Sequence, residues 1–130
     1  KPMSTWTRDE LDKIGTAEEL EIASLRQDGT LTKPVTIWVV RDSDGIYVRS
    51  VNGRSAAWFR GTHVRREGRI ETGGLDRDVM FVDADPEIND KLDAAYRTKY
   101  RRYAASIVDS IVSAKARATT MKLVQRSKSS

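Results

Sequence analysis

The fold is decided by residues 35–51, which read VTIWVVRDSDGIYVRSV. Apolar side chains occupy both faces of residues 35–40, a pattern that is typical of a buried strand in the centre of a sheet. The following Ser43-Asp44-Gly45 predicts a hairpin turn, because Asp-Gly tolerates the positive φ angles that tight turns require. Residues 46–51 are expected to form the returning strand. The sequence therefore predicts a β-hairpin at the centre of the fold.

Short strands are predicted on both sides of this hairpin. Alternation with a period of two over residues 18–26 indicates a half-buried strand. Residues 53–61 are bounded by two glycines and predict one to two helical turns. Turns between later strands are expected at Glu67-Gly68 and Gly73-Gly74. The strands predicted after the helical turns cover residues 62–66, 69–72, 79–83 and 119–123.

Helices are predicted near both ends of the chain. Residues 7–15 have the pattern of a capped helix, in which Thr7 is the cap and Glu10 completes a capping box. Asp85 precedes a proline and caps the clearest helix, whose apolar residues recur at helical spacing up to Tyr103. The helices predicted after Asp85 cover residues 86–103 and 104–112.

Composition indicates one small domain. The chain has 130 residues, of which 38% are hydrophobic and 32% charged, enough to fill one core and too charged for a membrane protein. We expect a single domain over residues 3–126, with residues 1–2 left over from cloning and residues 127–130 as a polar tail. The N-terminus has no secretory signal, so a cytoplasmic location is expected.

The residue types exclude several kinds of chemistry. The sequence has no cysteine, which rules out disulfides and thiolate ligands, and its single histidine, His63, removes most zinc and triad schemes. No metal site and no catalytic residue are assigned. The net charge of +4 is uneven, since residues 97–130 hold nine Lys and Arg and one acid. Much of this charge lies where a helix end favours cations, so it is weak support for a nucleic-acid partner.

The chain resembles a small uncharacterised bacterial family. The resemblance rests on residues 33–40, 45–50, 52–54 and 57–60, and on two later segments, Tyr96-Arg97-x-Lys99-Tyr100 and Arg117-Ala118-Thr119-Thr120. This family in turn resembles the split-barrel superfamily of flavin-binding proteins related to pyridoxamine-phosphate oxidases and deazaflavin-dependent nitroreductases. The order of predicted elements agrees with an antiparallel sheet that closes into a barrel. We expect an α+β fold, an antiparallel split β-barrel of about six strands with a short N-terminal helix and C-terminal helices.

The resemblance implies a cofactor site. It suggests an FMN or deazaflavin cofactor in a groove of the barrel, oxidoreductase activity on a small organic molecule, and a homodimer. Arginine forks and hydroxyl groups suit the cofactor phosphate, and a tryptophan suits the flavin ring. The positions that match the superfamily's binding residues are Lys33, Thr36, Trp38, Arg49, Ser50, Asn52, Gly53, Arg54, Ser55, Trp58 and Arg60.

Other interpretations stay open. Large aromatic residues dominate small cores, so Trp38 and Trp58 could be core anchors, and the arginines could be solvated. A cofactor-free barrel could bind a small ligand or catalyse a non-redox rearrangement. The segment Trp58-Phe59-Arg60 lies near further arginines and could hold a single nucleic-acid strand, although the acidic residues 9–28 weaken that alternative.

Overall fold

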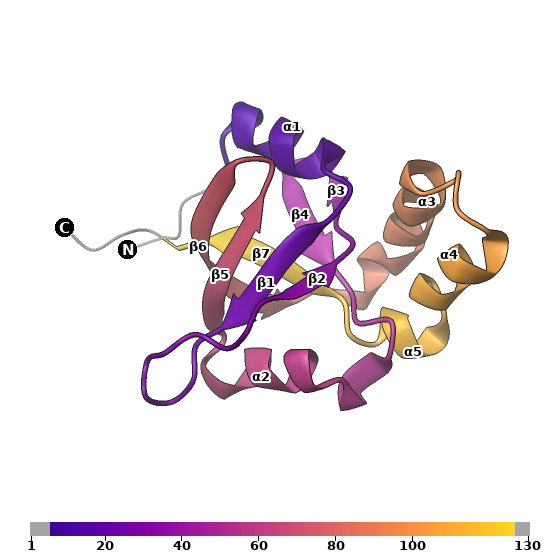
Figure 1. The fold of residues 1–130 in the computed structure, drawn as a ribbon. Helices are drawn as coiled ribbons and strands as arrows, with labels where there is room; N and C mark the ends of the chain where they lie inside the picture. The colour runs from indigo at the N-terminus through magenta and orange to yellow at the C-terminus, as the bar shows by residue number, and fades with distance from the viewer. Residues whose placement is uncertain (1–5, 127–130) are drawn as a thin grey trace.

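Seven strands form one sheet in the computed structural model, which describes residues 6–126 (Figure 1). Every pair of neighbouring strands is antiparallel, in the order β2-β1-β5-β6-β7-β4-β3. The expected α+β split barrel is confirmed, with seven strands instead of about six. The expectations for residues 1–2 and 127–130 lie outside the described residues. The strands are β1 (Leu20–Ser24), β2 (Val35–Ile37), β3 (Val40–Asp42), β4 (Gly45–Val48), β5 (Glu67–Thr72), β6 (Leu75–Asp83) and β7 (Met121–Gln125).

The two edge strands of the sheet are consecutive in the chain. Only Trp38 and Val39 connect β2 to β3, although the other five strands lie between these two in the sheet. The sheet must therefore curl until its edges come together, which produces a barrel with one split. The prediction of a single central strand over residues 35–40 is wrong, because this segment supplies both edges.

The split also explains why both faces of this segment are apolar. Val39 is fully buried in the cluster that fills the barrel. The next residue, Val40, is equally buried but belongs to a second cluster, which lies between the sheet and the C-terminal helices. The apolar pattern thus reflects two hydrophobic clusters that meet at the split, rather than two layers around one strand.

Two of the three predicted turns are present. β3 and β4 are joined at Ser43 and Asp44, and Ser43 takes the positive φ, 56°, that was expected of Asp-Gly. β5 and β6 turn at Gly73 and Gly74, whose φ angles are 55° and 84°. Glycine adopts such angles without the steric cost that a Cβ imposes, which is why this turn was visible in the sequence.

Two helices close the ends of the barrel (Figure 1). α1 (Arg8–Thr16) packs on β3 and β4 at one end, and α2 (Ala57–Arg65) packs on β1 at the other. The capping box of α1 is confirmed: the Thr7 hydroxyl accepts a hydrogen bond from the Glu10 N–H, and the Glu10 carboxylate accepts one from the Thr7 N–H.

α2 is longer than predicted. The strand expected over residues 62–66 is wrong, because the helix continues through them and buries Phe59 and Thr62, which lie three positions apart on one face. The turn expected at Glu67-Gly68 is also wrong, since both residues belong to β5. Gly68 is required there for packing: a Cβ at this position would lie 2.1 Å from the carbonyl oxygen of Ala23.

The remaining helices cover one side of the sheet (Figure 1). Asp85 caps the 3-10 turn η2 (Pro86–Ile88) as predicted, and α3 (Asn89–Lys99) follows but ends before the predicted Tyr103. α4 (Ala105–Ile111) matches the second predicted helix, whereas α5 (Ala114–Arg117) was not predicted. Within residues 6–126, the helices are too short or too polar to cross a bilayer.

The C-terminal end of α3 secures the split of the barrel. The Tyr100 hydroxyl accepts a hydrogen bond from the Val39 N–H at 3.1 Å and can donate to the carbonyl oxygens of Glu18 at 2.8 Å or Val39 at 3.1 Å. The Lys99 Nζ donates to the same Val39 carbonyl at 2.6 Å. Val39 lies between the two edge strands, so these side chains satisfy backbone groups that the sheet leaves unpaired.

Replacing Tyr100 tests this role. Tyr100→Phe is expected to lower the free energy of unfolding by about 1–3 kcal/mol, because the buried Val39 N–H loses its partner. Urea unfolding at neutral pH measures the loss. Tyr103→Phe is the matched control, since its half-buried hydroxyl bonds only the Glu18 carboxylate, and we expect a smaller loss. Equal losses in the two variants would contradict the role.

Lys99 gives the fold a pH dependence. Burial lowers the pKa of Lys99 from 10.5 to about 8. Between these values the unfolded chain holds a proton that the folded chain has released, so folding becomes more favourable as the pH rises. We expect the unfolding free energy of the wild type, relative to that of Lys99→Met, to rise between pH 7 and pH 9.5. Parallel pH profiles of the two proteins would refute this.

Candidate functional site

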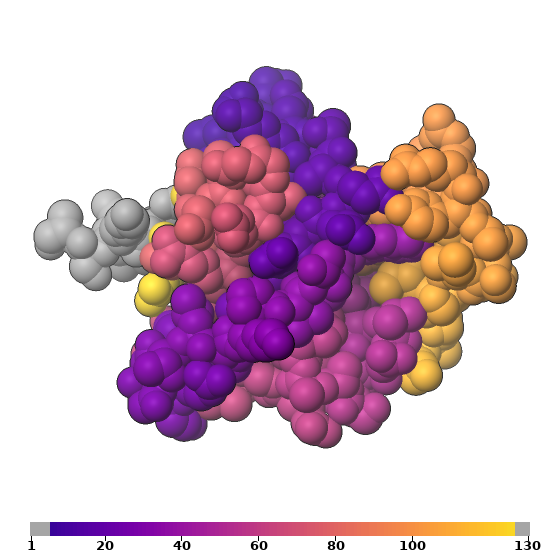
Figure 2. Space-filling model, viewed as in Figure 1, coloured from indigo at the N-terminus to yellow at the C-terminus, as the bar shows by residue number. Residues whose placement is uncertain are grey.

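A cleft of about 420 Å³ opens between β2 and α4. In Figure 2 the orange lobe that contains α4 stands beside the purple surface of β1 and β2. The cleft has the size of a small-molecule site, and its lining is mainly apolar with a few polar groups. The lining residues are Glu19, Val35, Thr36, Ile37, Trp38, Arg49, Val51, Asn52, Trp58, Ile107, Ser110 and Ile111.

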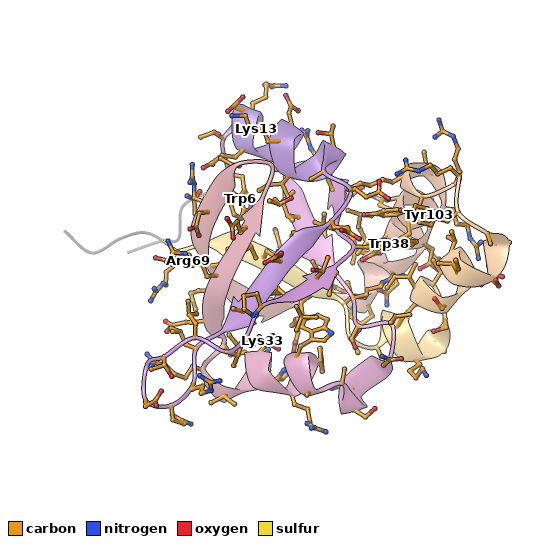
Figure 3. The ribbon with its side chains drawn as sticks, viewed as in Figure 1. Trp6, Lys13, Lys33, Trp38, Arg69 and Tyr103 are labelled. Carbon is orange, nitrogen blue, oxygen red and sulfur yellow. The ribbon has the colours of Figure 1, made fainter. Side chains whose placement is uncertain are left out.

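Two tryptophans line this cleft from different elements. Trp38 lies in the split of the barrel and stacks on Tyr100, with ring centroids 3.8 Å apart and planes inclined by 2°. Tyr103 meets the same indole edge-on at 4.9 Å, and Figure 3 shows Trp38 and Tyr103 together on the side that faces α3. Trp58 comes from the first turn of α2. The orientation of Trp38 is therefore fixed by packing before any ligand arrives.

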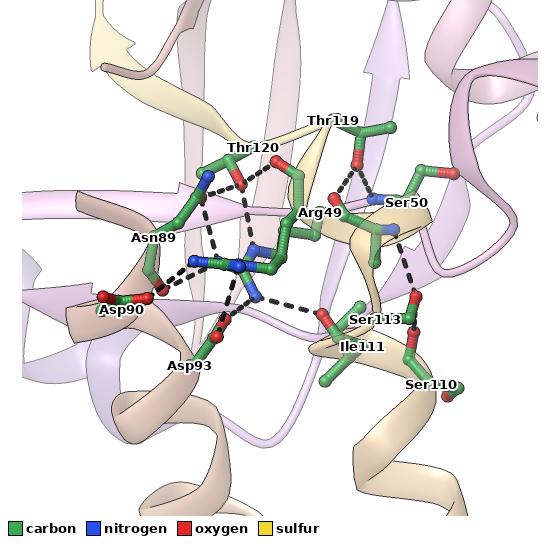
Figure 4. A network of polar contacts seen from close by, with 12 residues as sticks. Arg49, Ser50, Asn89, Asp90, Asp93, Ser110, Ile111, Ser113, Thr119 and Thr120 are labelled. Atoms are coloured by element: carbon green, nitrogen blue, oxygen red, sulfur yellow. Dashed lines mark hydrogen bonds and ion pairs between the residues drawn. The ribbon is translucent and has the colours of Figure 1, made fainter. Parts of the chain in front are cut away.

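Arg49 lines the cleft, and Figure 4 shows its guanidinium inside a network of polar contacts. Its side chain is fully buried and pairs with Asp93 at 2.6 Å. The other guanidinium contacts are the Thr120 hydroxyl at 3.0 Å, the Ile111 carbonyl at 3.1 Å, and the backbone and side-chain oxygens of Asn89 at 3.2 and 3.1 Å. These five hydrogen bonds use all five N–H groups of an arginine.

This arrangement corrects the interpretation of Arg49 as a phosphate ligand. With every donor engaged inside the protein, the guanidinium has none left for an external anion. Arg49 instead connects the end of β4 to α3, to α4 and to the start of β7. Its neighbour Ser50 is also buried, and its hydroxyl donates to the Gly53 carbonyl at 2.8 Å, so Ser50 holds a turn together rather than facing the cleft.

The structure brings part of the predicted site together. Thr36, Trp38, Asn52 and Trp58 line the cleft, besides Arg49. The other predicted residues lie outside its lining, and Figure 3 shows Lys33 apart from Trp38, at the opposite end of β2. Those outside the lining are Lys33, Ser50, Gly53, Arg54, Ser55 and Arg60.

The predicted basic residues next to the cleft are exposed. Arg54 donates to the Ala118 carbonyl at 3.2 Å and Arg60 to the Ser55 carbonyl at 3.0 Å. Gly53 has a φ of 79°, and the Lys115 side chain covers it so closely that a Cβ would lie 2.4 Å from it. Gly53 is therefore needed for the turn, while Arg54 and Arg60 are held at the surface by single backbone contacts.

Sequence reasoning missed the contribution of α4 and of Glu19. Ile107 and Ser110 on α4 line the cleft. Ile107 is 48% exposed, which is unusual for an isoleucine on an amphipathic helix. Glu19 lines the cleft as well. An apolar residue left exposed can be recognised only when the packing of the helix is known.

Comparison with protein families identifies the chain over most of its length. Residues 10–123 match the family DUF2255, described as an uncharacterized protein conserved in bacteria. The chain belongs to this family. No curated protein sequence matches it significantly.

Solved structures with the same fold agree with the split barrel. The heme storage protein HutZ from Vibrio cholerae has a TM-score of 0.54 at 15% identity, with 87% of this chain and 83% of HutZ covered. An F420 reductase has a TM-score of 0.55 at 13% identity, with coverage of 91% and 92%. An FAD-binding protein from Mesorhizobium loti has a TM-score of 0.51 at 14% identity, with coverage of 99% and 95%. At these identities the similarity establishes the fold of the DUF2255 chain alone.

Removing Arg49 tests its role in the structure. Arg49→Met is expected to cost about 3–5 kcal/mol of unfolding free energy, because several oxygens lose their donor and the half-buried Asp93 carboxylate keeps only its longer ion pair with Arg117, at 3.4 Å. Arg54→Met, at an exposed position with one backbone contact, should cost less than about 1 kcal/mol. Chemical denaturation compares the two. A near-neutral Arg49→Met variant would contradict the structural role.

Proposed function

We propose that this protein is an oxidoreductase, which binds a flavin or deazaflavin in the cleft and uses this cofactor to oxidise or reduce a small organic molecule. The observation that carries the proposal is the cleft lined by Trp38 and Trp58 in a split barrel whose fold recurs in an F420 reductase and an FAD-binding protein. The cofactor would supply the redox chemistry, and the protein would supply binding and orientation.

The cleft fits the ring of such a cofactor better than its phosphate. Two indoles and aliphatic side chains offer apolar surface, and Thr36, Asn52 and Ser110 offer hydrogen-bonding groups. No unpaired cation lies in the described lining, since Arg49 is fully engaged. We therefore assign the phosphate to the exposed Arg54 and Arg60, outside the cleft.

Heme fits the cleft less well. Heme iron takes an axial ligand such as His, Cys, Met or Tyr, and the twelve lining residues within the described chain include none of these. The single histidine, His63, lies on α2 outside the lining, with its Nδ1 2.9 Å from the Thr62 hydroxyl and its Nε2 3.8 Å from Asp83. The geometry favours a flavin-type ligand.

Nucleic-acid binding is not favoured by the surface charges. The arginines that suggested it are paired with carboxylates: Arg65 with Glu67 at 3.4 Å, Arg66 with Asp83 at 3.0 Å, and Arg69 with Asp76. Such pairs reduce the positive field that would attract phosphates. The homodimer and the cytoplasmic location stay predictions of the sequence, and a cofactor-free barrel remains the alternative if no flavin binds.

Cofactor titration tests the proposal. FMN, riboflavin and F420 are added to the purified protein, and tryptophan quenching and cofactor fluorescence report binding. We expect Trp58→Ala to weaken all three by roughly tenfold or more, as loss of an aromatic stacking partner does. Arg54→Ala should weaken FMN by about 1.5–3 kcal/mol and leave riboflavin, which has no phosphate, unchanged.

Val64→Ala is the matched control for these variants. Val64 is exposed on α2 and lies outside the cleft lining, so its truncation should leave all affinities unchanged. Failure of all three cofactors to bind below about millimolar concentration would overturn the proposal. Equal losses for FMN and riboflavin in Arg54→Ala would remove Arg54 from the phosphate site.

A further inference from the structure

We propose that the cleft selects a positively charged organic molecule, with Glu19 as the group that recognises the charge. This inference deepens the proposed function, since it rests on the cleft being a ligand site and names the class of substrate. The class is a protonated amine or quaternary ammonium ion attached to an apolar body.

This inference rests on the charged residues that line the cleft. Only Arg49 and Glu19 are ionisable among its lining residues. The charge of Arg49 is balanced by Asp93 at 2.6 Å, and all its donors are used. Within residues 6–126, no Lys, Arg or His nitrogen lies within ion-pair distance of the Glu19 carboxylate. The uncompensated charge of the cleft is therefore negative.

Two adjacent glutamates, Glu18 and Glu19, differ in whether their carboxylates have partners within the protein. Glu18 is engaged in the closure of the split: its carboxylate pairs with Arg102 at 2.5 Å and accepts a hydrogen bond from Tyr103, which lowers the pKa of Glu18. Glu19 has no such side-chain partner in the described structure, although its backbone carbonyl accepts a hydrogen bond from Thr72 at 2.6 Å. The backbone of Glu19 is fixed while its carboxylate stays available.

Neighbouring carboxylates reinforce the negative potential. A groove of about 300 Å³ next to the cleft shares Glu19 and Thr36 with it and adds Glu21 and Glu71. These two glutamates lie directly opposite each other on β1 and β5. Like charges in this position repel, so a cation at this end of the cleft relieves the repulsion as well as pairing with Glu19.

The aromatic lining suits the same class of ligand. Tryptophan is the best partner in cation–π interactions, and cages of aromatic residues recognise ammonium groups in this way. Trp38 and Trp58 line the cleft together with Glu19, while Val35, Ile37 and Ile107 offer apolar surface for the body of the ligand. An anionic substrate would be repelled by the Glu19 carboxylate and by the negative faces of the indole rings.

Three probes of similar size and different charge test this selectivity. Benzylamine, benzyl alcohol and benzoate are titrated into the full chain at pH 7, with tryptophan fluorescence as the readout. We expect the protonated benzylamine to bind about tenfold tighter than benzyl alcohol, as a charged hydrogen bond implies, and benzoate to bind weakest. Glu19→Gln should reduce the preference for benzylamine to about twofold or less.

Asp44→Asn is the matched control, because it removes the same charge at an exposed position in the turn between β3 and β4, outside both the cleft and the adjacent groove. It should keep most of the preference for benzylamine. Equal effects of the two variants, no preference in the wild type, or no binding of benzylamine would each overturn the proposal. Cofactor binding is measured on the same preparations. Bound cofactor without charge selectivity refutes this inference alone, and charge selectivity without bound cofactor refutes the redox function alone.

Discussion

The structure depends on how the two residues between β2 and β3 are accommodated. They join strands at opposite edges of a seven-stranded sheet, so the chain itself forces the sheet to curl and leaves a split where no ladder can form. Backbone polar groups buried at such a break are costly unless they find partners. The Tyr100 hydroxyl and the Lys99 ammonium provide those partners at Val39. The closure of the barrel therefore depends on the packing of α3 against the split.

The cleft is a consequence of the same closure. Stacking of Trp38 on Tyr100 fixes one wall, and the Arg49 network ties α3 and α4 to the ends of β4 and β7. Ile107 on α4 lines the cleft and remains partly exposed. The buried Arg49 holds the elements around the site in place and has no N–H group left to donate to a ligand. This division leaves Glu19 as the ionic group that a ligand can reach.

Local signals in the sequence predicted many of the elements. The capping box at Thr7 and Glu10, the Asp85 cap and the two-glycine turn all depend on neighbouring residues, and all are present. The errors occurred where distant contacts decide. Residues 62–66 are helical because Phe59 and Thr62 reach the core together. The apolar run over residues 35–40 serves two clusters, which no local period can distinguish from one buried strand.

By itself, the sequence determined the α+β class, the split barrel, most turns and caps, and four of the cleft's residues besides Arg49. These follow from backbone preferences and apolar periodicity, which act over a few residues, and from resemblance over most of the chain. Only the tertiary structure decided that Arg49 is saturated and that Glu19 is free, because the partners of a charge come from segments far apart in the chain. Arg49 meets residues 40 to 71 positions away. The chemistry of the cleft is set by these pairings.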